Sequence, residues 1–198
     1  MRILIVGATG TIGREIVQTL SEGNELVLVS RNSTPVKVDI SDPASIKAMY
    51  QAVGKVDAVI SAAGPAKFAP LDQLGDSDFQ FSLDNKLMGQ VNLVRFGFDF
   101  VRDGGSITVT SGVLARMAMQ GSGAVSLVNA GLEGFTRSAA LEAPRGIRVN
   151  IVSPPWVKET MEAYGMDSSS GLPAAVVAQS YVESVKGSQT GMVLEPKA

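Results

Sequence analysis

The 198-residue sequence contains no cysteine and no histidine. The absence of cysteine excludes disulfide bonds and thiolate metal sites, and the absence of histidine excludes imidazole metal ligands and any nucleophile activated by histidine. Acid and base chemistry is therefore left to tyrosine, lysine and carboxylate side chains, and we expect no metal site.

A strong charge of either sign and a long apolar segment are also lacking. The formal net charge is -2 at pH 7, which gives no basic field to attract nucleic acid or an anionic membrane. The apolar-rich run over residues 1–6 is too short for a signal peptide or a membrane span. We therefore expect a cytoplasmic protein that binds neither nucleic acid nor membranes.

Short β-branched runs alternate with helical segments, and no linker or repeat interrupts them, which predicts one domain over residues 1–198. The runs are apolar on both faces, as strands of a parallel sheet require. The pattern predicts an α/β fold, a Rossmann-like doubly wound parallel sheet of about seven strands with helices on both faces, in three layers. The expected strands cover residues 2–6, 26–29, 36–40, 56–63, 106–110 and 147–152.

Two further segments have a local signature. Asp42 directly precedes Pro43, an arrangement that favours a helix capped by Asp42. Residues 165–175 are rich in small and polar side chains and are expected to form a mobile loop.

The most specific motif is GATGTIG, residues 7–13, directly after the first expected strand and at the start of the first expected helix. There Gly7 would permit a tight turn, Gly10 would let the backbone approach a pyrophosphate, and Gly13 would allow close helix packing. The spacing differs from G-x-G-x-x-G, so the position after a buried strand carries the prediction of a dinucleotide site, with a purely structural turn as the alternative. Further expected contacts of this turn are Thr9, Thr11 and Ile12.

The second expected strand ends in VSRNS, where an NAD site usually carries an acidic residue. Arg31 stands there instead, and its guanidinium can hold a 2'-phosphate bidentately, so NADP(H) is favoured over NAD(H). The alternative is a solvated loop arginine. The expected contacts of the adenosine half are Arg31, Asn32, Ile40 and Asp39, which would end the third strand and meet the adenine amino group.

Six segments match a known pattern: GATGTIG, VDI at 38–40, SAAG at 61–64, GGSITVTSG at 104–112, residues 130–156 and TGMVLE at 190–195. In these segments the chain resembles the short-chain dehydrogenase/reductase family. The resemblance implies an NAD(P)-dependent oxidoreductase whose cofactor lies across the first four strands, with SPPW at 153–156 near the nicotinamide. Pro155 replaces the family's glycine and loses a backbone donor. The contacts implied are Ala62, Ala63, Gly64, Pro154, Pro155 and Val157.

The chain departs from the family at the catalytic positions. Family members use a Tyr that donates a proton, a Lys four residues later, a Ser that orients the substrate and an Asn. The resemblance puts Val125 at the Tyr position, Asn129 at the Lys position and Gly112 at the Ser position. Lys86 falls at the Asn position, with Asn85 as the alternative if the helix register shifts. Neither Val125 nor Asn129 can transfer a proton.

The catalytic candidates are therefore Lys86, Ser111, Asn129 and Tyr164. An apolar pocket would lower the pKa of Lys86 and make it an acid or electrostatic stabiliser, but its stem could equally pack on the helix with the ammonium in water. As a neighbour of Gly112, Ser111 is expected to point to the opposite face. Tyr164 lies in the segment that forms a lid in relatives, and it could donate a proton or only pack the lid.

Two functions stay open. The favoured one is an NADP(H)-dependent oxidoreductase that transfers hydride to or from a small carbonyl or alcohol with a non-standard proton donor. The alternative is a catalytically inactive NADP-binding sensor or scaffold. The resemblance also implies a homodimer or homotetramer through helices over residues 83–102 and 123–142. Their apolar stripe would extend beyond one sheet face, through Leu87, Val91, Val94 and Phe98.

Overall fold

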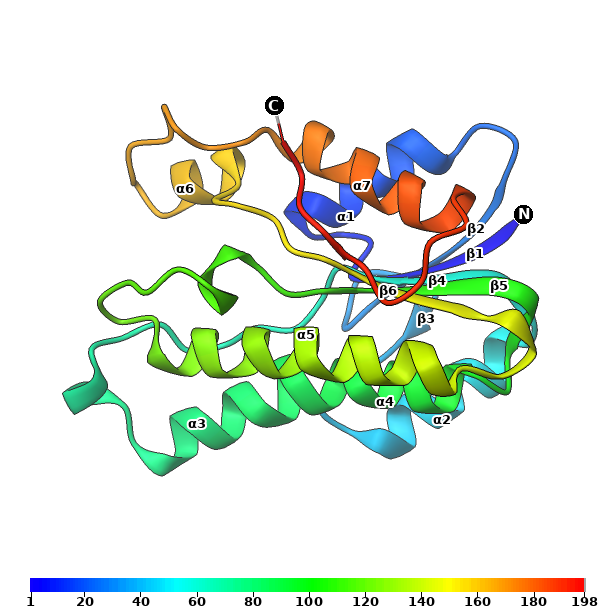
Figure 1. Ribbon diagram of the computed structural model, residues 1–198, viewed down its shortest axis with the longest axis horizontal. Coiled ribbons are helices and arrows are strands. Elements are labelled where there is room, and N and C mark those ends of the chain that lie inside the picture. Colours follow the sequence, from blue (N-terminus) through cyan, green and yellow to red (C-terminus); the bar gives the residue numbers. More distant parts are fainter. Residues whose placement is uncertain (198) are drawn as a thin grey trace.

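Seven parallel strands form one sheet in the order β3-β2-β1-β4-β5-β6-β7. The structure is a computed structural model that describes residues 1–197. Its Rossmann-like architecture confirms the fold expected from the sequence (Figure 1). The strands are β1 Arg2–Val6, β2 Glu25–Ser30, β3 Val36–Lys37, β4 Val56–Ser61, β5 Val101–Thr110, β6 Arg148–Val152 and β7 Val193–Leu194.

Helices cover both faces of the sheet, as Figure 1 shows. One face carries α1 (Thr11–Leu20) and α7 (Ala174–Lys186), with α6 (Lys158–Ala163) beside them. The other face carries α2 (Pro43–Val53), α3 (Asp76–Ser82), the π-helix η2 (Leu83–Met88), α4 (Gly89–Gly97) and α5 (Gly123–Glu142). Short 3-10 turns are η1 Leu71–Gln73, η3 Val113–Ala115 and η4 Pro144–Gly146. No helix within residues 1–197 is long and apolar enough to cross a bilayer.

Two hydrophobic cores lie on opposite faces of the sheet. Successive side chains of a strand alternate between faces, so Ile3 and Ile5 pack toward α1 and α7 while Leu4 and Val6 pack toward the other helices. All four are buried. A parallel sheet covered on both faces requires this, which explains the near-continuous apolar runs of the sequence.

The structure corrects three expectations. The third strand stops at Lys37, so Asp39 follows it instead of ending it. The expected helix over 83–102 ends at Gly97, and Arg145 donates hydrogen bonds to the carbonyls of Phe98 and Val101 beyond that end.

The third correction concerns the apolar stripe of α4. Val91 and Val94 are buried against the chain's own sheet, and Leu87 and Phe98 pack on the same core. Val91 and Val94 are thus covered within the layer that α4 forms with α2 and α5, whereas Leu87 and Phe98 are only partly buried.

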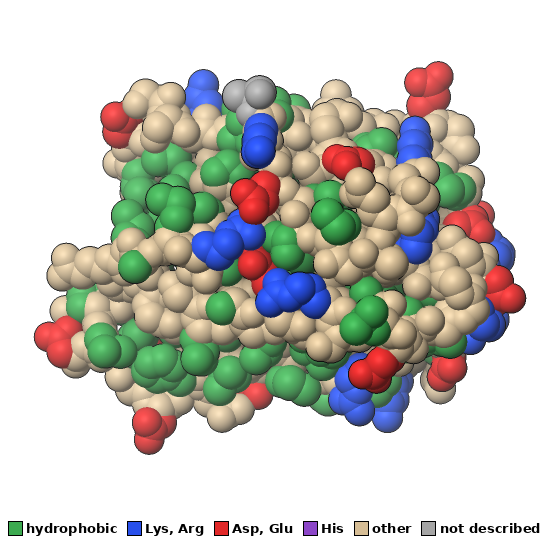
Figure 2. All heavy atoms as spheres, in the orientation of Figure 1, with side chains coloured by type: hydrophobic (Ala, Val, Ile, Leu, Met, Phe, Trp, Pro, Cys, Tyr) green, Lys and Arg blue, Asp and Glu red, His purple; other side chains and the backbone are tan. Residues whose placement is uncertain are grey.

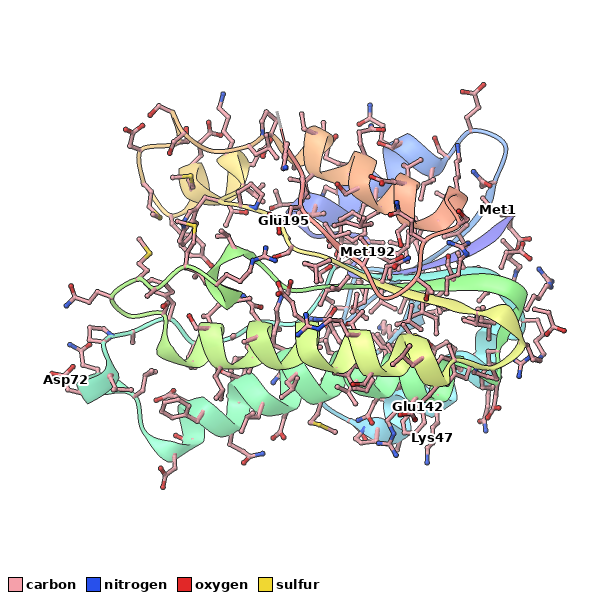
Figure 3. All side chains as sticks on the ribbon, in the orientation of Figure 1. Met1, Lys47, Asp72, Glu142, Met192 and Glu195 are labelled. Carbon is pink, nitrogen blue, oxygen red and sulfur yellow. The ribbon has the colours of Figure 1, made fainter. Side chains whose placement is uncertain are left out.

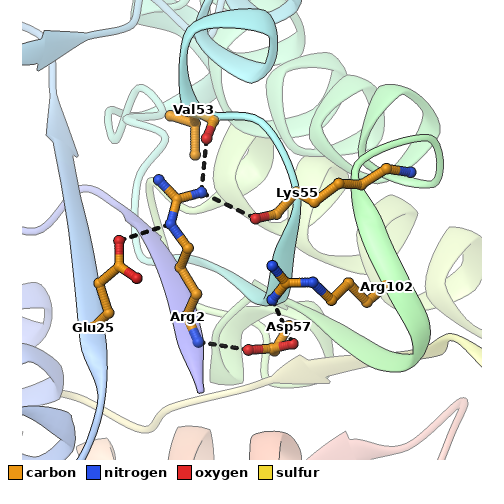
Figure 4. Close-up of polar contacts among 6 residues, drawn as sticks. All are labelled: Arg2, Glu25, Val53, Lys55, Asp57 and Arg102. Carbon is orange, nitrogen blue, oxygen red and sulfur yellow. Dashed lines mark hydrogen bonds and ion pairs between the residues drawn. The ribbon is translucent and has the colours of Figure 1, made fainter.

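A charged cluster ties four strands together at the amino edge of the sheet (Figure 4). Arg2 donates from its Nε to Glu25 at 2.8 Å and from its Nη1 to the Val53 carbonyl at 2.7 Å. The Asp57 carboxylate accepts the Arg2 backbone N–H at 2.6 Å and the Arg102 guanidinium at 2.8 Å. The hydrogen bond from the Arg2 backbone, followed by that from Arg102, holds the pKa of Asp57 below its usual 3.8.

We expect Asp57→Asn to lower the free energy of unfolding at pH 7 by about 1 kcal/mol, since charge-assisted hydrogen bonds are lost. A depressed folded pKa gives stability that is present above the unfolded pKa and lost as pH falls through the folded value. The deficit should therefore shrink below about pH 4. Urea unfolding of wild type and variant at both pH values measures it. Asp103→Asn is the control, because Asp103 pairs with Arg145 but is 78% exposed. A deficit equal at both pH values would contradict the account.

Candidate active site

The glycine-rich turn after β1 leaves a stretch of backbone open at the start of α1. Gly7 has φ +86°, and a Cβ there would lie 2.8 Å from the Ala62 carbonyl oxygen. A Cβ on Gly13 would collide with the Gly7 carbonyl. Gly10 is exposed and begins α1 without a side-chain cap. Gly7 and Gly13 are thus required by packing, whereas Gly10 leaves the first N–H groups of the helix free for an anion.

A cavity of about 310 Å³, which we call the N-terminal cleft, lies at this turn. The carboxyl ends of parallel strands meet at one edge of a sheet, and the cleft lies where β1, β2 and β4 end. Expected cofactor residues that line it are Gly7, Thr9, Gly10, Arg31, Ile40, Ala62, Ala63 and Gly64. Others lie around it: Thr11, Ile12 and Gly13 in the first turn of α1, Asn32 on the exposed loop after β2, and Asp39 beside Arg31.

Arg31 lines the N-terminal cleft and bonds to residues of two other segments. Its Nη2 lies 3.1 Å from Asp39 Oδ1 and 3.2 Å from Asn85 Oδ1. Asp39 also accepts two hydrogen bonds from Ser41, and these, with Arg31, lower the pKa of Asp39. Asn85 is buried and donates to the Phe81 carbonyl at 3.0 Å. Asn85 thus faces Arg31, which leaves the neighbouring Lys86 to face the end of β5.

Lys86 lies in the π-helix η2, a conformation that is frequent at functional sites. Its stem packs over the loop after β4, since a Cβ on Gly64 would lie 3.1 Å from Lys86 Cα and 3.3 Å from Cδ. Its Nζ lies 3.5 Å from the Ser111 carbonyl oxygen. Desolvation by the surrounding protein lowers the pKa of Lys86 to about 8. The ammonium group therefore lies between the N-terminal cleft and the residues that follow β5.

Gln90, one helical turn after Lys86, fixes this arrangement. Its carboxamide accepts the Thr110 N–H and donates to the Thr110 carbonyl, both at 2.8 Å. The Thr110 hydroxyl donates to the Ser61 carbonyl at 2.6 Å. Its only proton is then used, so the Tyr181 hydroxyl, 2.6 Å away, must donate to it. Helices from both faces of the sheet are thus attached to the last residue of β5, a role that the sequence did not reveal for Gln90.

A second cavity of about 160 Å³, the central cavity, lies beyond the ends of β5 and β6. Asn129 of α5 lines it with 3% of its surface exposed, and its Oδ1 has no hydrogen-bond partner among residues 1–197. A Cβ on Gly112 would lie 3.2 Å from Asn129 Nδ2. An unpaired buried carbonyl costs about 1–3 kcal/mol, so Asn129 is suited to receive a donor from a ligand. Other lining residues are Ser111, Val113, Leu114, Pro154, Pro155, Trp156, Val157 and Thr160.

The Ser111 side chain reaches α5, the helix that also carries Asn129. Its hydroxyl donates to Glu133 Oε1 at 3.0 Å, one turn of α5 beyond Asn129. Glu133 is buried, and Arg116 Nη1 lies 3.6 Å from its carboxylate and 2.9 Å from that of Glu195. Figure 2 shows charged side chains gathered near the centre of the face that it draws, and Figure 3 labels Glu195 in the same region. No local pattern predicts this network, since its members come from distant segments of the chain.

A third cavity of about 630 Å³, the outer cavity, adjoins the central cavity and shares Leu114 and Trp156 with it. Val125 and Tyr164 both line it. Tyr164 follows the last turn of α6, and 75% of it is exposed. The other lining residues are Ala66, Lys67, Phe68, Met119, Gln120 and Met166. The 70–74 turn that carries Asp72 lies at this end of the molecule, opposite Met1 (Figure 3).

Metal binding finds no support in the side chains of residues 1–197. Within this range no group of three aspartate or glutamate side chains could hold a metal ion.

A family model described as enoyl-(acyl carrier protein) reductase matches residues 7–190. The chain belongs to the short-chain dehydrogenase/reductase family. It is 29% identical to the oxidoreductase UcpA of Escherichia coli, over 89% of this chain and 77% of UcpA. It is 28% identical to the 3-oxoacyl-(acyl-carrier-protein) reductase FabG of Escherichia coli, over 88% of this chain and 81% of FabG. A hydroxynaphthalene reductase of Aspergillus fumigatus is 27% identical, and the match spans only 63% of that reductase.

Solved structures extend the family likeness over the whole chain. The protein lin1944 of Listeria innocua is 39% identical, with a TM-score of 0.95 and full coverage of both chains. A small-chain dehydrogenase solved in complex with NADPH is 28% identical, with a TM-score of 0.88 over 98% of this chain and 95% of that one. This short-chain dehydrogenase/reductase is therefore an oxidoreductase by family, with a fold typical of NAD(P) binding.

Proposed function

We propose that this protein is an NADP(H)-dependent oxidoreductase that interconverts a carbonyl compound and its alcohol. The observation that carries the proposal is the position of Lys86, whose ammonium lies between the N-terminal cleft and the central cavity. The NADPH complex of a relative with 28% identity supports the choice of cofactor.

The cavities fit the two halves of a dinucleotide. The free N–H groups at the start of α1 suit a pyrophosphate, with Thr9, Gly10, Thr11 and Ile12 around it. Arg31 suits a 2'-phosphate, because Nη2 holds Asp39 and Asn85 while a guanidinium has five N–H donors. In the central cavity, the unpartnered Asn129 Oδ1 suits the carboxamide N–H of a nicotinamide, with Pro154, Pro155 and Val157 as the opposite wall.

Lys86 supplies the charge that the reaction needs. When bound, NADPH supplies the hydride that is added to the carbonyl carbon. The Lys86 ammonium stabilises the negative charge that develops on the oxygen and donates its proton there, and the neutral amine regains a proton from water. A pKa of about 8 suits this role.

The tyrosines favour a lysine mechanism. None of Tyr50, Tyr164 and Tyr181 is followed by a lysine four residues later. Burial raises the pKa of Tyr50 and of Tyr181, and their hydroxyls bond to Leu93 and Thr110. Tyr164 in the outer cavity is the second candidate donor. A catalytically inactive NADP-binding protein is the alternative function, favoured by the aliphatic Val125 and the neutral Asn129 at the positions that the family resemblance assigns to Tyr and Lys.

Cofactor binding tests the role of Arg31. Arg31→Ala should weaken NADPH binding about tenfold and leave NADH binding unchanged, because only NADPH carries the 2'-phosphate. Calorimetric titration with both dinucleotides measures this. Arg137→Ala, an exposed arginine on α5, is the control. An equal loss for both cofactors, or no loss at all, would reject the assignment of Arg31.

The pH dependence of turnover tests the role of Lys86. Wild-type kcat/KM should fall as pH rises above about 8, where Lys86 loses its proton. Lys86→Met keeps the apolar stem and removes the charge, so kcat/KM should drop at least about 100-fold. The remaining kcat/KM should no longer fall above about pH 8, and NADPH affinity should change little. Lys47→Met on α2 is the matched control.

The reciprocal variant restores the family pair through Val125→Tyr with Asn129→Lys. If wild type shows no hydride transfer and this double variant gains it, the protein is a binding protein without chemistry of its own. If wild-type turnover persists in Lys86→Met, the lysine mechanism is rejected and Tyr164 becomes the donor to test.

We also propose a homodimer or homotetramer, in keeping with the symmetric assemblies common among enzymes. Exposed apolar side chains that such an interface could use include Leu127 and Leu141 on α5, 50% and 90% exposed, and Met88. Sedimentation at micromolar concentration should show at least a dimer, and Leu141→Glu should weaken it. A monomer under those conditions would contradict the assembly.

A further inference from the structure

The outer cavity is walled by aromatic and sulfur-containing side chains. Phe68 and Trp156 meet edge to face, with ring centroids 6.4 Å apart and an interplanar angle of 75°. Met119 and Met166 lie in the same wall. Aromatic edges and polarizable thioethers favour contact with a further aromatic ring over contact with an alkyl group of the same size.

Free charge is lacking in this wall. Lys67 is the one charged residue among the lining side chains that the structure describes. Its Nζ lies 3.6 Å from Asp78 Oδ1 and 5.3 Å from the centre of the Phe81 ring. Lys67 is thus held by the chain itself, so a charged ligand would find no unpaired partner here.

Backbone hydrogen bonds hold the two segments that carry the aromatic residues. The Trp156 carbonyl accepts the Leu172 N–H at 2.8 Å, and the Gly121 carbonyl accepts the Ala69 N–H at 3.1 Å. Gly121 has φ +82°, and a Cβ there would lie 3.1 Å from the Phe68 ring. The chain itself therefore holds the segments that carry Phe68 and Trp156, which lowers the entropy lost on binding.

The volume and the openings of the outer cavity indicate the size of the ligand. A cavity of about 630 Å³ is in the range that takes drug-sized molecules, far above the needs of a three-carbon ketone. Phe68, Met119 and Met166 remain 49%, 45% and 39% exposed, so apolar surface is left for a ligand to cover. Through Trp156 the outer cavity continues into the central cavity.

We propose that the substrate is an uncharged aromatic carbonyl compound with about two fused rings, or the corresponding alcohol. The ring system fills the outer cavity against Phe68 and Trp156, and the carbonyl group points into the central cavity. This inference rests on the proposed function, since it assigns the substrate of the same site. A straight acyl chain, a saturated ring system and a carboxylate are the competing ligands.

Trp156 is the only tryptophan of the chain, so its fluorescence reports on the outer cavity without turnover. The intact protein, saturated with NADP⁺, is titrated with β-tetralone, β-decalone, methyl octyl ketone, cyclohexanone and tetralin-2-carboxylate. We expect β-tetralone to bind at least about tenfold more tightly than cyclohexanone and the carboxylate, and about 2- to 10-fold more tightly than β-decalone and the linear ketone. β-Decalone has nearly the size and shape of β-tetralone, so their ratio isolates the aromatic contribution.

Phe68→Leu keeps apolar bulk and removes the ring. It should erase the preference for β-tetralone over β-decalone and leave β-decalone affinity within about twofold. Met192→Leu, at an exposed position directly before β7, is the control and should change neither. Equal affinity for the two ketones in wild type, tighter binding of the linear ketone or the carboxylate, or a preference that survives Phe68→Leu would overturn the proposal.

Binding and turnover separate the two proposals. If β-tetralone binds as expected but is not reduced with NADPH, the oxidoreductase proposal fails and the ligand class stands. If the protein reduces cyclohexanone as efficiently as β-tetralone, the oxidoreductase proposal stands and the aromatic preference is rejected.

Discussion

The Gln90 carboxamide holds both the N–H and the carbonyl of Thr110, the last residue of β5. The Gln90 side chain makes the two hydrogen bonds that a neighbouring strand would make further along the sheet. It thereby attaches the helical segment that carries Lys86 to the end of β5. On the opposite face, Tyr181 reaches the same residue through the Thr110 hydroxyl. A buried polar group without its partner is costly. The whole set must therefore form together, and the position of the Lys86 ammonium follows from it.

The three cavities follow from the parallel sheet. Because all seven strands run in the same direction, their carboxyl ends share one edge, and the loops that follow β1, β4, β5 and β6 meet there. In the proposed function, the N-terminal cleft holds phosphates through backbone N–H groups, small residues and Arg31. The proposed chemistry in the central cavity takes its charge and its proton from Lys86, on a helix other than α5. Under this proposal, binding and catalysis depend on different residues.

The sequence predicted the parts of the molecule that depend on local chemistry. Gly7 and Gly13 are required by backbone geometry, and Asp42 caps α2 by accepting the Ala44 N–H. The end of α4 at Gly97 was missed, because long-range contacts from Arg145 satisfy the released carbonyls. Within the site, the family resemblance singled out Lys86, and its role stays a prediction. The links among Arg116, Glu133 and Glu195, like the ring pair of Phe68 and Trp156, join segments whose proximity no local pattern encodes.

In the proposed mechanism Lys86 lies between cofactor and substrate, and a crystal structure of the protein with NADPH tests this directly. We expect the pyrophosphate at the backbone of Gly10, the 2'-phosphate at Arg31 and the nicotinamide in the central cavity beside Asn129. The Lys86 Nζ should lie within hydrogen-bond reach of the bound cofactor or of the space beside its nicotinamide. A dinucleotide bound elsewhere, or a Lys86 side chain turned out to solvent in the complex, would contradict the account.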